Sequence, residues 1–111
     1  MTDRELLELA AKAAGIEITW EHGRDYPERV ELFRGHLANY EPWDPLNLDG
    51  DAFRLVAQLG LDIEFGNEHV WCCIEDMENY VMHPLAGDRA AAARRVVVES
   101  AAAIQQAKEA K

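Results

Sequence analysis

The sequence predicts an α+β fold in which an antiparallel sheet of four or five strands packs with three helices. Three segments, at the two ends and the centre of the chain, carry apolar residues at helical spacing. Between them, apolar and polar residues alternate with a period of two, as in half-buried strands. The expected order is α-β-(β)-α-β-β-β-α, in a single domain that spans residues 1–111.

The first helix is expected from Asp3 to Ala14. Thr2 and Glu5 have the spacing of a capping box, in which the hydroxyl accepts a hydrogen bond from the amide three residues later. An apolar stripe follows, and Gly15 supplies the left-handed conformation that commonly ends a helix.

A strand follows the first helix, because Ile16, Ile18 and Trp20 alternate with polar residues. A turn is expected from His22 to Pro27, where Gly, Asp and Pro are found together. The alternation then predicts a second, shorter strand from Val30 to Phe33.

The segment from Gly35 to Asp49 has no period and contains two prolines, which predicts an ordered surface loop. Its aromatic residues Tyr40 and Trp43 are the candidate binding residues, because rigid aromatic side chains are enriched where proteins bind one another. For Trp43 there is a structural alternative. It would then fold back over the sheet or the start of the next helix as an anchor of the loop.

The central helix is expected to begin with Asp49 as its cap and to end at Gly60. Its apolar positions follow the i, i+3, i+4, i+7 pattern: Ala52, Leu55, Val56 and Leu59. Asp49-Gly50-Asp51 is interpreted as a helix start and not as a calcium loop, because the spaced aspartates and the terminal glutamate of such loops are missing.

Three consecutive strands are expected next: Leu61 to Phe65, Val70 to Ile74 and Tyr80 to His83. Gly66-Asn67 is a two-residue hairpin signal, and a second turn is predicted from Asp76 to Asn79. Such a meander has no helical crossover, which excludes a parallel sheet.

The last helix is predicted from Arg89 to about Lys108, with Asp88 as its cap. Helices and strands together define an expected core: Leu6, Leu9, Ile18, Trp20, Leu55, Val56, Leu59, Ile63, Val70, Ile74, Val97 and Ile104.

Charge limits the classes of partner. Eleven Lys and Arg against 21 Asp and Glu give a net charge of −10, which repels phosphate backbones and anionic lipids. No direct nucleic-acid or membrane binding is therefore expected. No apolar run approaches the ~20 residues that span a bilayer, and the N-terminal residues lack the pattern of a secretory signal. These features predict a cytoplasmic protein.

No cofactor, metal or catalytic group is expected. The soft-metal ligand types are His69, Cys72, Cys73 and His83, but adjacent residues of a strand point to opposite faces, so at most one cysteine can join the histidines. Cys73, His83 and Asp76 have the residue types of a nucleophile, base and acid, without any motif that supports such a site. The sequence therefore predicts a protein that is not an enzyme.

A resemblance gives the expected origin. WDPLNLDGDAFRLVAQLGL, from Trp43 to Leu61, lies between a start that reads TDRELLELAAKAAGI and a terminal helix rich in Ala and Arg. This arrangement resembles a family of small hypothetical phage and prophage proteins with a W-x-P-L loop and an Asp-Gly-Asp-Ala helix start. It is also similar to phage αβα-sandwich domain proteins. Asp44 replaces the usual asparagine, and a second loop proline is present. The resemblance lends no catalytic or binding residues.

The expected function is that of a non-enzymatic phage or prophage accessory protein, which binds a host or phage protein in the bacterial cytoplasm. An alternative from the charge of −10 is an acidic inhibitor that mimics nucleic acid and blocks a host defence or regulatory protein. A small hydrolase or metal protein is the third hypothesis. The sequence sets no oligomeric state.

Overall fold

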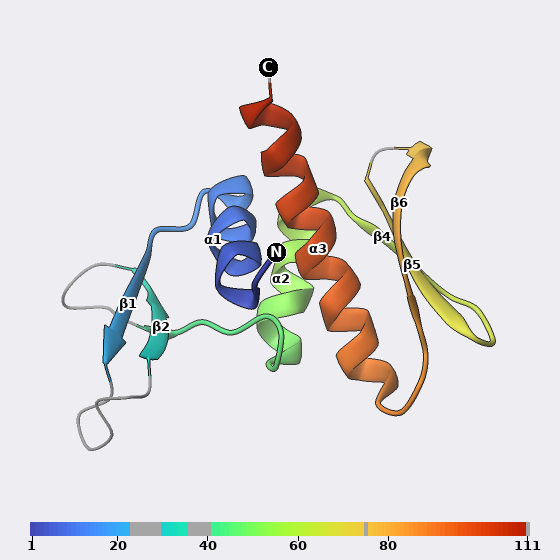
Figure 1. Ribbon diagram of the computed structural model, residues 1–111, viewed down its shortest axis with the longest axis horizontal. Helices are drawn as coiled ribbons and strands as arrows, with labels where there is room; N and C mark the ends of the chain where they lie inside the picture. Colours follow the sequence, from blue (N-terminus) through green and yellow to red (C-terminus); the bar gives the residue numbers. More distant parts are fainter. Residues whose placement is uncertain (23–29, 36–40, 75, 111) are drawn as a thin grey trace.

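The computed structural model describes residues 1–22, 30–35, 41–74 and 76–110. Within these ranges it contains three helices and six strands, and the strands form two antiparallel sheets. The C-terminal helix α3 (Arg89–Glu109) lies at the centre, with α1 (Asp3–Ala14) on one side and the sheet β4-β5-β6 on the other (Figure 1). The α+β class and the order of the predicted elements are confirmed.

The first and last helices begin where their caps predict. The Thr2 hydroxyl accepts a hydrogen bond from the Glu5 amide at 3.2 Å, and the Asp88 carboxylate accepts one from the Ala91 amide at 3.1 Å. Each bond satisfies an amide that has no partner within its helix. Gly15 ends α1 at φ 70°, in the left-handed region that glycine adopts without strain.

The central helix α2 (Asp49–Leu59) has the predicted bounds but not the predicted cap. Asp49 is the first helical residue, and Leu48 occupies the cap position without a side-chain bond. The Asp49 carboxylate instead accepts a 2.6 Å bond from Arg94 of α3. The interpretation of Asp49 as a cap is therefore wrong, because a distant cation binds the side chain that would have capped the helix.

The first sheet combines β1 (Ile18–His22), β2 (Val30–Arg34) and the short β3 (Glu41–Pro42). The two predicted strands are confirmed, and Trp20 pairs with Leu32 in their register. The predicted loop contains β3, so it is not irregular throughout. Most of the predicted turn that starts at His22 lies outside the described residues, and His22 itself belongs to β1.

The second sheet consists of β4 (Asp62–Phe65), β5 (His69–Ile74) and β6 (Asp76–Pro84). The predicted hairpin is confirmed, and Phe65 pairs with Val70. Its loop is shifted by one residue, because the Gly66 amide donates to the His69 carbonyl at 2.8 Å. The predicted turn from Asp76 to Asn79 is wrong, since β6 already begins at Asp76.

The sequence predicts one sheet of four or five strands. The strands instead divide between two sheets of three. The helices lie between the two sheets (Figure 1). β1 is connected to α1, where Trp20 Nε1 donates to Glu8 at 3.2 Å, whereas β5 and β6 contact α3. The two sheets are thus separated by the helices (Figure 1).

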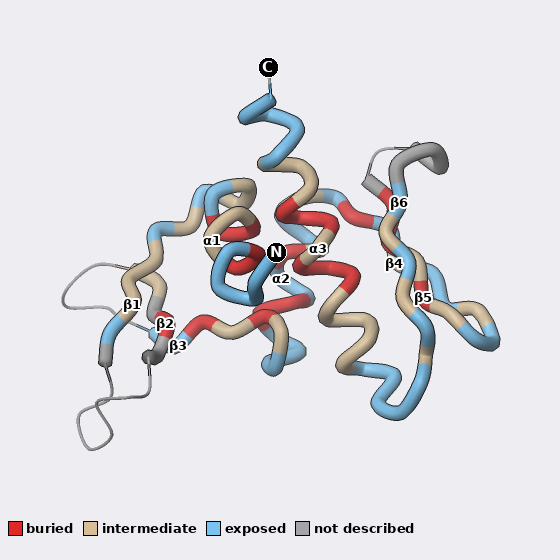
Figure 2. The backbone as a smooth tube through the Cα atoms, viewed as in Figure 1, coloured by how far each residue is buried: buried red, intermediate tan, exposed pale blue. Residues whose placement is uncertain are grey.

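The core surrounds the middle of α3 (Figure 2), where three consecutive valines, Val96 to Val98, are buried. Three successive side chains point in different directions around a helix, so their common burial follows from neighbours on several sides. Four predicted core residues are buried: Leu6, Leu55, Val70 and Val97. Seven pack on the core with partial exposure: Leu9, Ile18, Trp20, Val56, Leu59, Ile63 and Ile104. The Ile74 side chain lies outside the described part.

Among the described residues, no helix has both the length and the apolar character needed to cross a bilayer. The longest, α3, carries four arginines and lysines and two glutamates among its 21 residues.

Candidate functional site

Trp43, one of the two candidate binding residues, is a core residue. Its side chain is 2% exposed, and its backbone amide donates to the Leu32 carbonyl of β2 at 3.0 Å. The indole therefore anchors the segment between β3 and α2, and it offers no surface to a partner. This outcome matches the structural alternative and contradicts the contact interpretation of Trp43. Tyr40, the other candidate, lies outside the described residues.

The four residues with soft-metal ligand types lie on two faces of the second sheet. Cys72 faces α3 in the core, and the partly exposed His83 lies on the same face, with its Nε2 2.8 Å from Glu99. Cys73 belongs to the opposite face, and His69 contacts Trp71 there with ring centroids 6.1 Å apart. No group of three or more ligand residues converges within the described ranges.

The same geometry separates the residue types of a nucleophilic site. Cys73 and His83 are on opposite faces of the sheet, and the Asp76 side chain lies outside the described part. Burial raises the pKa of the Cys72 thiol, while the neighbouring Ser100 hydroxyl acts in the opposite direction. A thiol with a raised pKa is held in its neutral, unreactive form.

The two aspartates of the Asp49-Gly50-Asp51 segment both bind protein donors. Asp49 accepts from Arg94, and the buried Asp51 carboxylate accepts from the Asp44 amide at 2.9 Å. Asp51 thereby fixes the approach of the preceding segment to α2. Both carboxylates therefore have structural roles in these contacts, and neither is the helix cap that the sequence predicts at Asp49.

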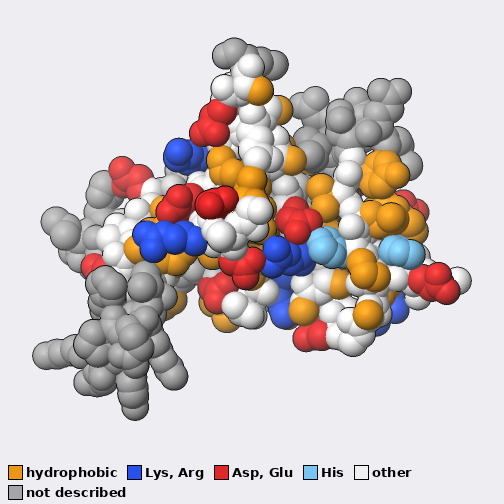
Figure 3. Space-filling model, in the orientation of Figure 1, with side chains coloured by type: hydrophobic (Ala, Val, Ile, Leu, Met, Phe, Trp, Pro, Cys, Tyr) orange, Lys and Arg blue, Asp and Glu red, His pale blue; other side chains and the backbone are white. Residues whose placement is uncertain are grey.

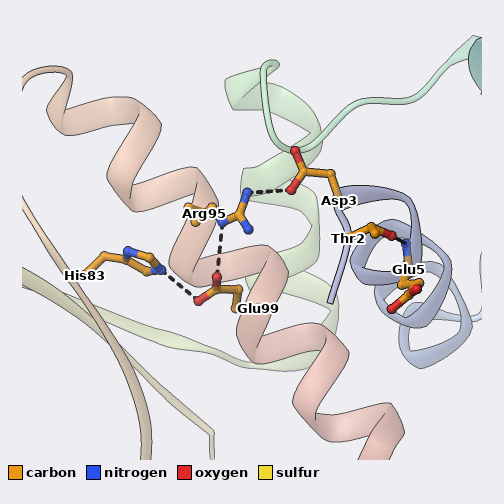
Figure 4. Close-up of polar contacts among 6 residues, drawn as sticks. All are labelled: Thr2, Asp3, Glu5, His83, Arg95 and Glu99. Carbon is orange, nitrogen blue, oxygen red and sulfur yellow. Dashed lines mark hydrogen bonds and ion pairs between the residues drawn. The ribbon is translucent and has the colours of Figure 1, made fainter.

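A polar chain connects the second sheet with the two long helices (Figure 4). His83 of β6 contacts Glu99, Glu99 accepts from Arg95 Nε at 3.1 Å, and Arg95 Nη1 donates to Asp3 of α1 at 2.6 Å. The hydrogen bond to Asp3 raises the pKa of the Arg95 guanidinium, so the cation is permanent. Each contact is partly exposed and individually weak, at about 0–1 kcal/mol. Together they align α1, α3 and β6.

Carboxylates on the surface are frequently paired. On the face shown in Figure 3, Asp and Glu side chains are interspersed with Lys and Arg. Several described carboxylates form ion pairs with arginine or lysine: Asp3, Glu8, Glu41, Asp49, Glu99 and Glu109. A nucleic-acid mimic requires unpaired carboxylates in a row, an arrangement that these pairs do not favour.

An apolar groove of about 480 Å³ lies where α2, β4 and the start of α3 meet, and we call it the α2–α3 groove. Two phenylalanines stand at its rim: Phe53 of α2 is 71% exposed and Phe65 of β4 is 51% exposed. Between them the lining is aliphatic, with Val56 from α2 and Ile63 from β4. Large apolar side chains that remain exposed around a hollow form a patch typical of interaction sites.

The α3 side of the groove combines small residues with charge. Ala90 and Ala93 leave room above the buried Val97, so a ligand can approach the helix closely. Arg94 is held in place, since its Nε donates to the Leu46 carbonyl at 2.8 Å and its Nη1 binds Asp49. This pair makes that end of the groove electrically neutral.

Local sequence patterns do not predict this groove. Phe53 is adjacent to the apolar stripe of α2 but does not belong to it. This position outside the stripe is the sequence signal that indicates an exposed side chain. Phe65 has the alternation of an inward-facing strand residue, yet the strand ends there and the ring stays half exposed. The aromatic composition of the loop before α2 predicts a binding site there instead, although its Trp43 is buried.

Comparison of the chain with protein-family models, with curated proteins and with solved structures gave no match.

Proposed function

We propose that this chain is a non-enzymatic accessory protein of a phage or prophage, which acts in the host cytoplasm by binding another protein. The resemblance of the Trp43 to Leu61 segment supports the origin. The α2–α3 groove supports the binding function, and the observation that carries it is the exposure of Phe53 and Phe65 at its rim.

Energetics support this interpretation of the groove. A phenylalanine that stays in water forgoes about 1.5–3 kcal/mol of burial free energy, so two at one site are costly unless a partner covers them. The packing of α2 on the core does not depend on Phe53, because the helix is buried there through Leu55 and Ala52. Large aromatic side chains at the rim of a hollow are also the residues that most often dominate binding energy.

The test is affinity capture from host cells that carry the phage or prophage. The bait is the wild-type chain, the groove variant is Phe53→Ser with Phe65→Ser, and the control is Tyr80→Ser with Met82→Ser. The control residues are exposed apolar side chains of β6, outside the groove. We expect a protein that wild type and control capture equally and the groove variant does not. Equal capture by all three baits would contradict the groove as the site.

The same experiment distinguishes the alternatives. A nucleic-acid mimic would keep its partner in the groove variant and lose it when exposed carboxylates such as Asp62 and Glu64 become amides. A metal protein would carry a stoichiometric metal ion after purification without chelator.

A further inference from the structure

We infer that the occupant of the α2–α3 groove is an apolar peptide segment of a partner protein that places an Asp or Glu carboxylate on Arg89. This inference rests on the proposed function, since it assigns a chemistry to the partner of the same groove.

Arg89 and Arg54 are the two described arginines that form no ion pair with a carboxylate, and of these two Arg89 contacts a residue of the groove. Arg4, Arg34, Arg94 and Arg95 all form ion pairs with carboxylates. Within the described ranges Arg89 forms none, and its guanidinium lies over the Phe65 ring, 5.7 Å from the centroid. The chain has 21 acidic and 11 basic residues, so most cations can find a carboxylate within the protein. An arginine at the edge of a groove without such a partner is therefore available to a carboxylate of a ligand.

The position of Arg89 in its helix strengthens this argument. It is the first residue of α3, and the first turn of that helix contains no acidic residue. The exposed amides of a helix N-terminus favour anions and disfavour cations, so an arginine there does not serve helix stability. The Asp88 carboxylate already accepts from the Ala91 amide at this helix end, so an incoming carboxylate would bind through the Arg89 guanidinium.

The net charge of −10 does not prevent such a contact. At physiological ionic strength the Debye length is about 8 Å, so exposed charges beyond that distance are largely screened. Close to the groove, Arg94 and Asp49 neutralise each other at 2.6 Å. Arg89, which lies over Phe65 and has no carboxylate ion pair, is therefore the charge available to an acidic group at this edge of the groove.

The size and openness of the groove favour a peptide over a small amphiphile. The rim phenylalanines are more exposed than buried, so an occupant must cover them from outside as well as fill the hollow between them. A free fatty acid fills the hollow and leaves the outer faces of Phe53 and Phe65 in water. A peptide segment covers both.

The test is the selection of a random 12-residue peptide library on the immobilised chain. We expect enriched peptides to combine apolar residues with an Asp or Glu and to bind Arg89→Glu about tenfold more weakly or worse than wild type. Replacing the peptide's acid by Lys should restore binding to Arg89→Glu. The matched control is Arg54→Glu on α2. It reverses the charge of an exposed arginine that, like Arg89, has no carboxylate partner but, unlike Arg89, does not lie over Phe65, and it should leave binding unchanged.

The Arg89→Glu variant is expected to fold. Loss of the contact with Phe65 and gain of a favourable charge at the helix end are effects of similar size, so Tm should stay within about 5 °C of wild type. Peptides without an acid, peptides that bind Arg89→Glu as well as wild type, or no enrichment would overturn the inference. Dodecanoate binding that requires Arg89, without peptide enrichment, would assign the groove to a small apolar carboxylate and overturn it too.

The failure of this inference is distinguishable from that of the proposed function. If enriched peptides lose binding to Phe53→Ser but not to Arg89→Glu, the groove binds protein, and the assignment of a partner carboxylate to Arg89 is wrong. If they bind Phe53→Ser with Phe65→Ser as tightly as wild type, the groove itself is not the site.

Discussion

Replacement of Trp43 by alanine should remove a large part of the stability of this protein. The indole is 2% exposed and belongs to the cluster that includes Leu55 and Val97. A Trp side chain that buries about 150–250 Å² at ~25 cal/mol per Å² contributes roughly 4–6 kcal/mol. Alanine retains a small share of this, so the expected loss is ~3–5 kcal/mol, out of a total of about 5–15 kcal/mol for a small domain.

Urea denaturation followed by far-UV circular dichroism measures this loss directly. For a chain of this size the corresponding decrease in Tm is roughly 10–20 °C. The matched control is Phe53→Ala, an aromatic truncation at a residue that is 71% exposed, which should change stability by less than ~0.5 kcal/mol.

Binding supplies the second half of the test. At a temperature where Trp43→Ala is still folded, it should capture the same partner as wild type, whereas Phe53→Ala should lose it. A Trp43→Ala protein with an unchanged urea midpoint and no partner binding would refute the reasoning, because it would make the indole a contact residue.

Three further substitutions and one chemical measurement test the packing. Gly66→Ala should destabilise the fold by ~1–3 kcal/mol in thermal melts, since the new Cβ would lie 2.5 Å from Trp71 Cζ3. Gly50→Ala in α2 should instead stabilise the fold by ~0.4–1 kcal/mol, because its Cβ would meet no other atom. Ser100→Ala should be neutral or stabilising by up to ~1–3 kcal/mol in urea titrations. The buried Ser100 Oγ has no strong hydrogen-bond partner among the described residues, and the neighbouring Cys72 thiol is at most a weak one. The Cys72 thiol should resist iodoacetamide in the native state at pH 8 and react in denaturant, as mass spectrometry of the peptide will show. Because its pKa is raised on folding, its contribution to stability is complete below the unfolded pKa of about 8.5 and falls as the pH rises beyond it.

Local signals predicted the helices well because their ends depend on neighbouring residues. Thr2 and Asp88 cap with their own side chains, and Gly15 ends α1 through its own φ angle. The Asp49 cap failed for a non-local reason, since Arg94 lies 45 residues away and binds that carboxylate in the folded state.

The number of sheets and the binding surface depend on contacts that no local pattern encodes. Alternation predicts which residues form strands, yet it does not determine whether β2 pairs with β3 or with a strand of the later meander. The same limit applies to the groove. Phe53 is exposed because α3 and β4 stop short of covering it, and that follows only from the arrangement of all three elements.

The central position of α3 has a consequence for biosynthesis. The helix contacts α1, α2, β5 and β6, all of which leave the ribosome before it does. At the usual elongation rate of about 5–20 residues per second, the 21 residues of α3 take roughly 1–4 s to be made. Until then the nascent chain exposes the apolar surfaces that will cover Val96 to Val98. A chaperone that binds the nascent chain, or a protease that cleaves it, would therefore act in the interval before α3 is made.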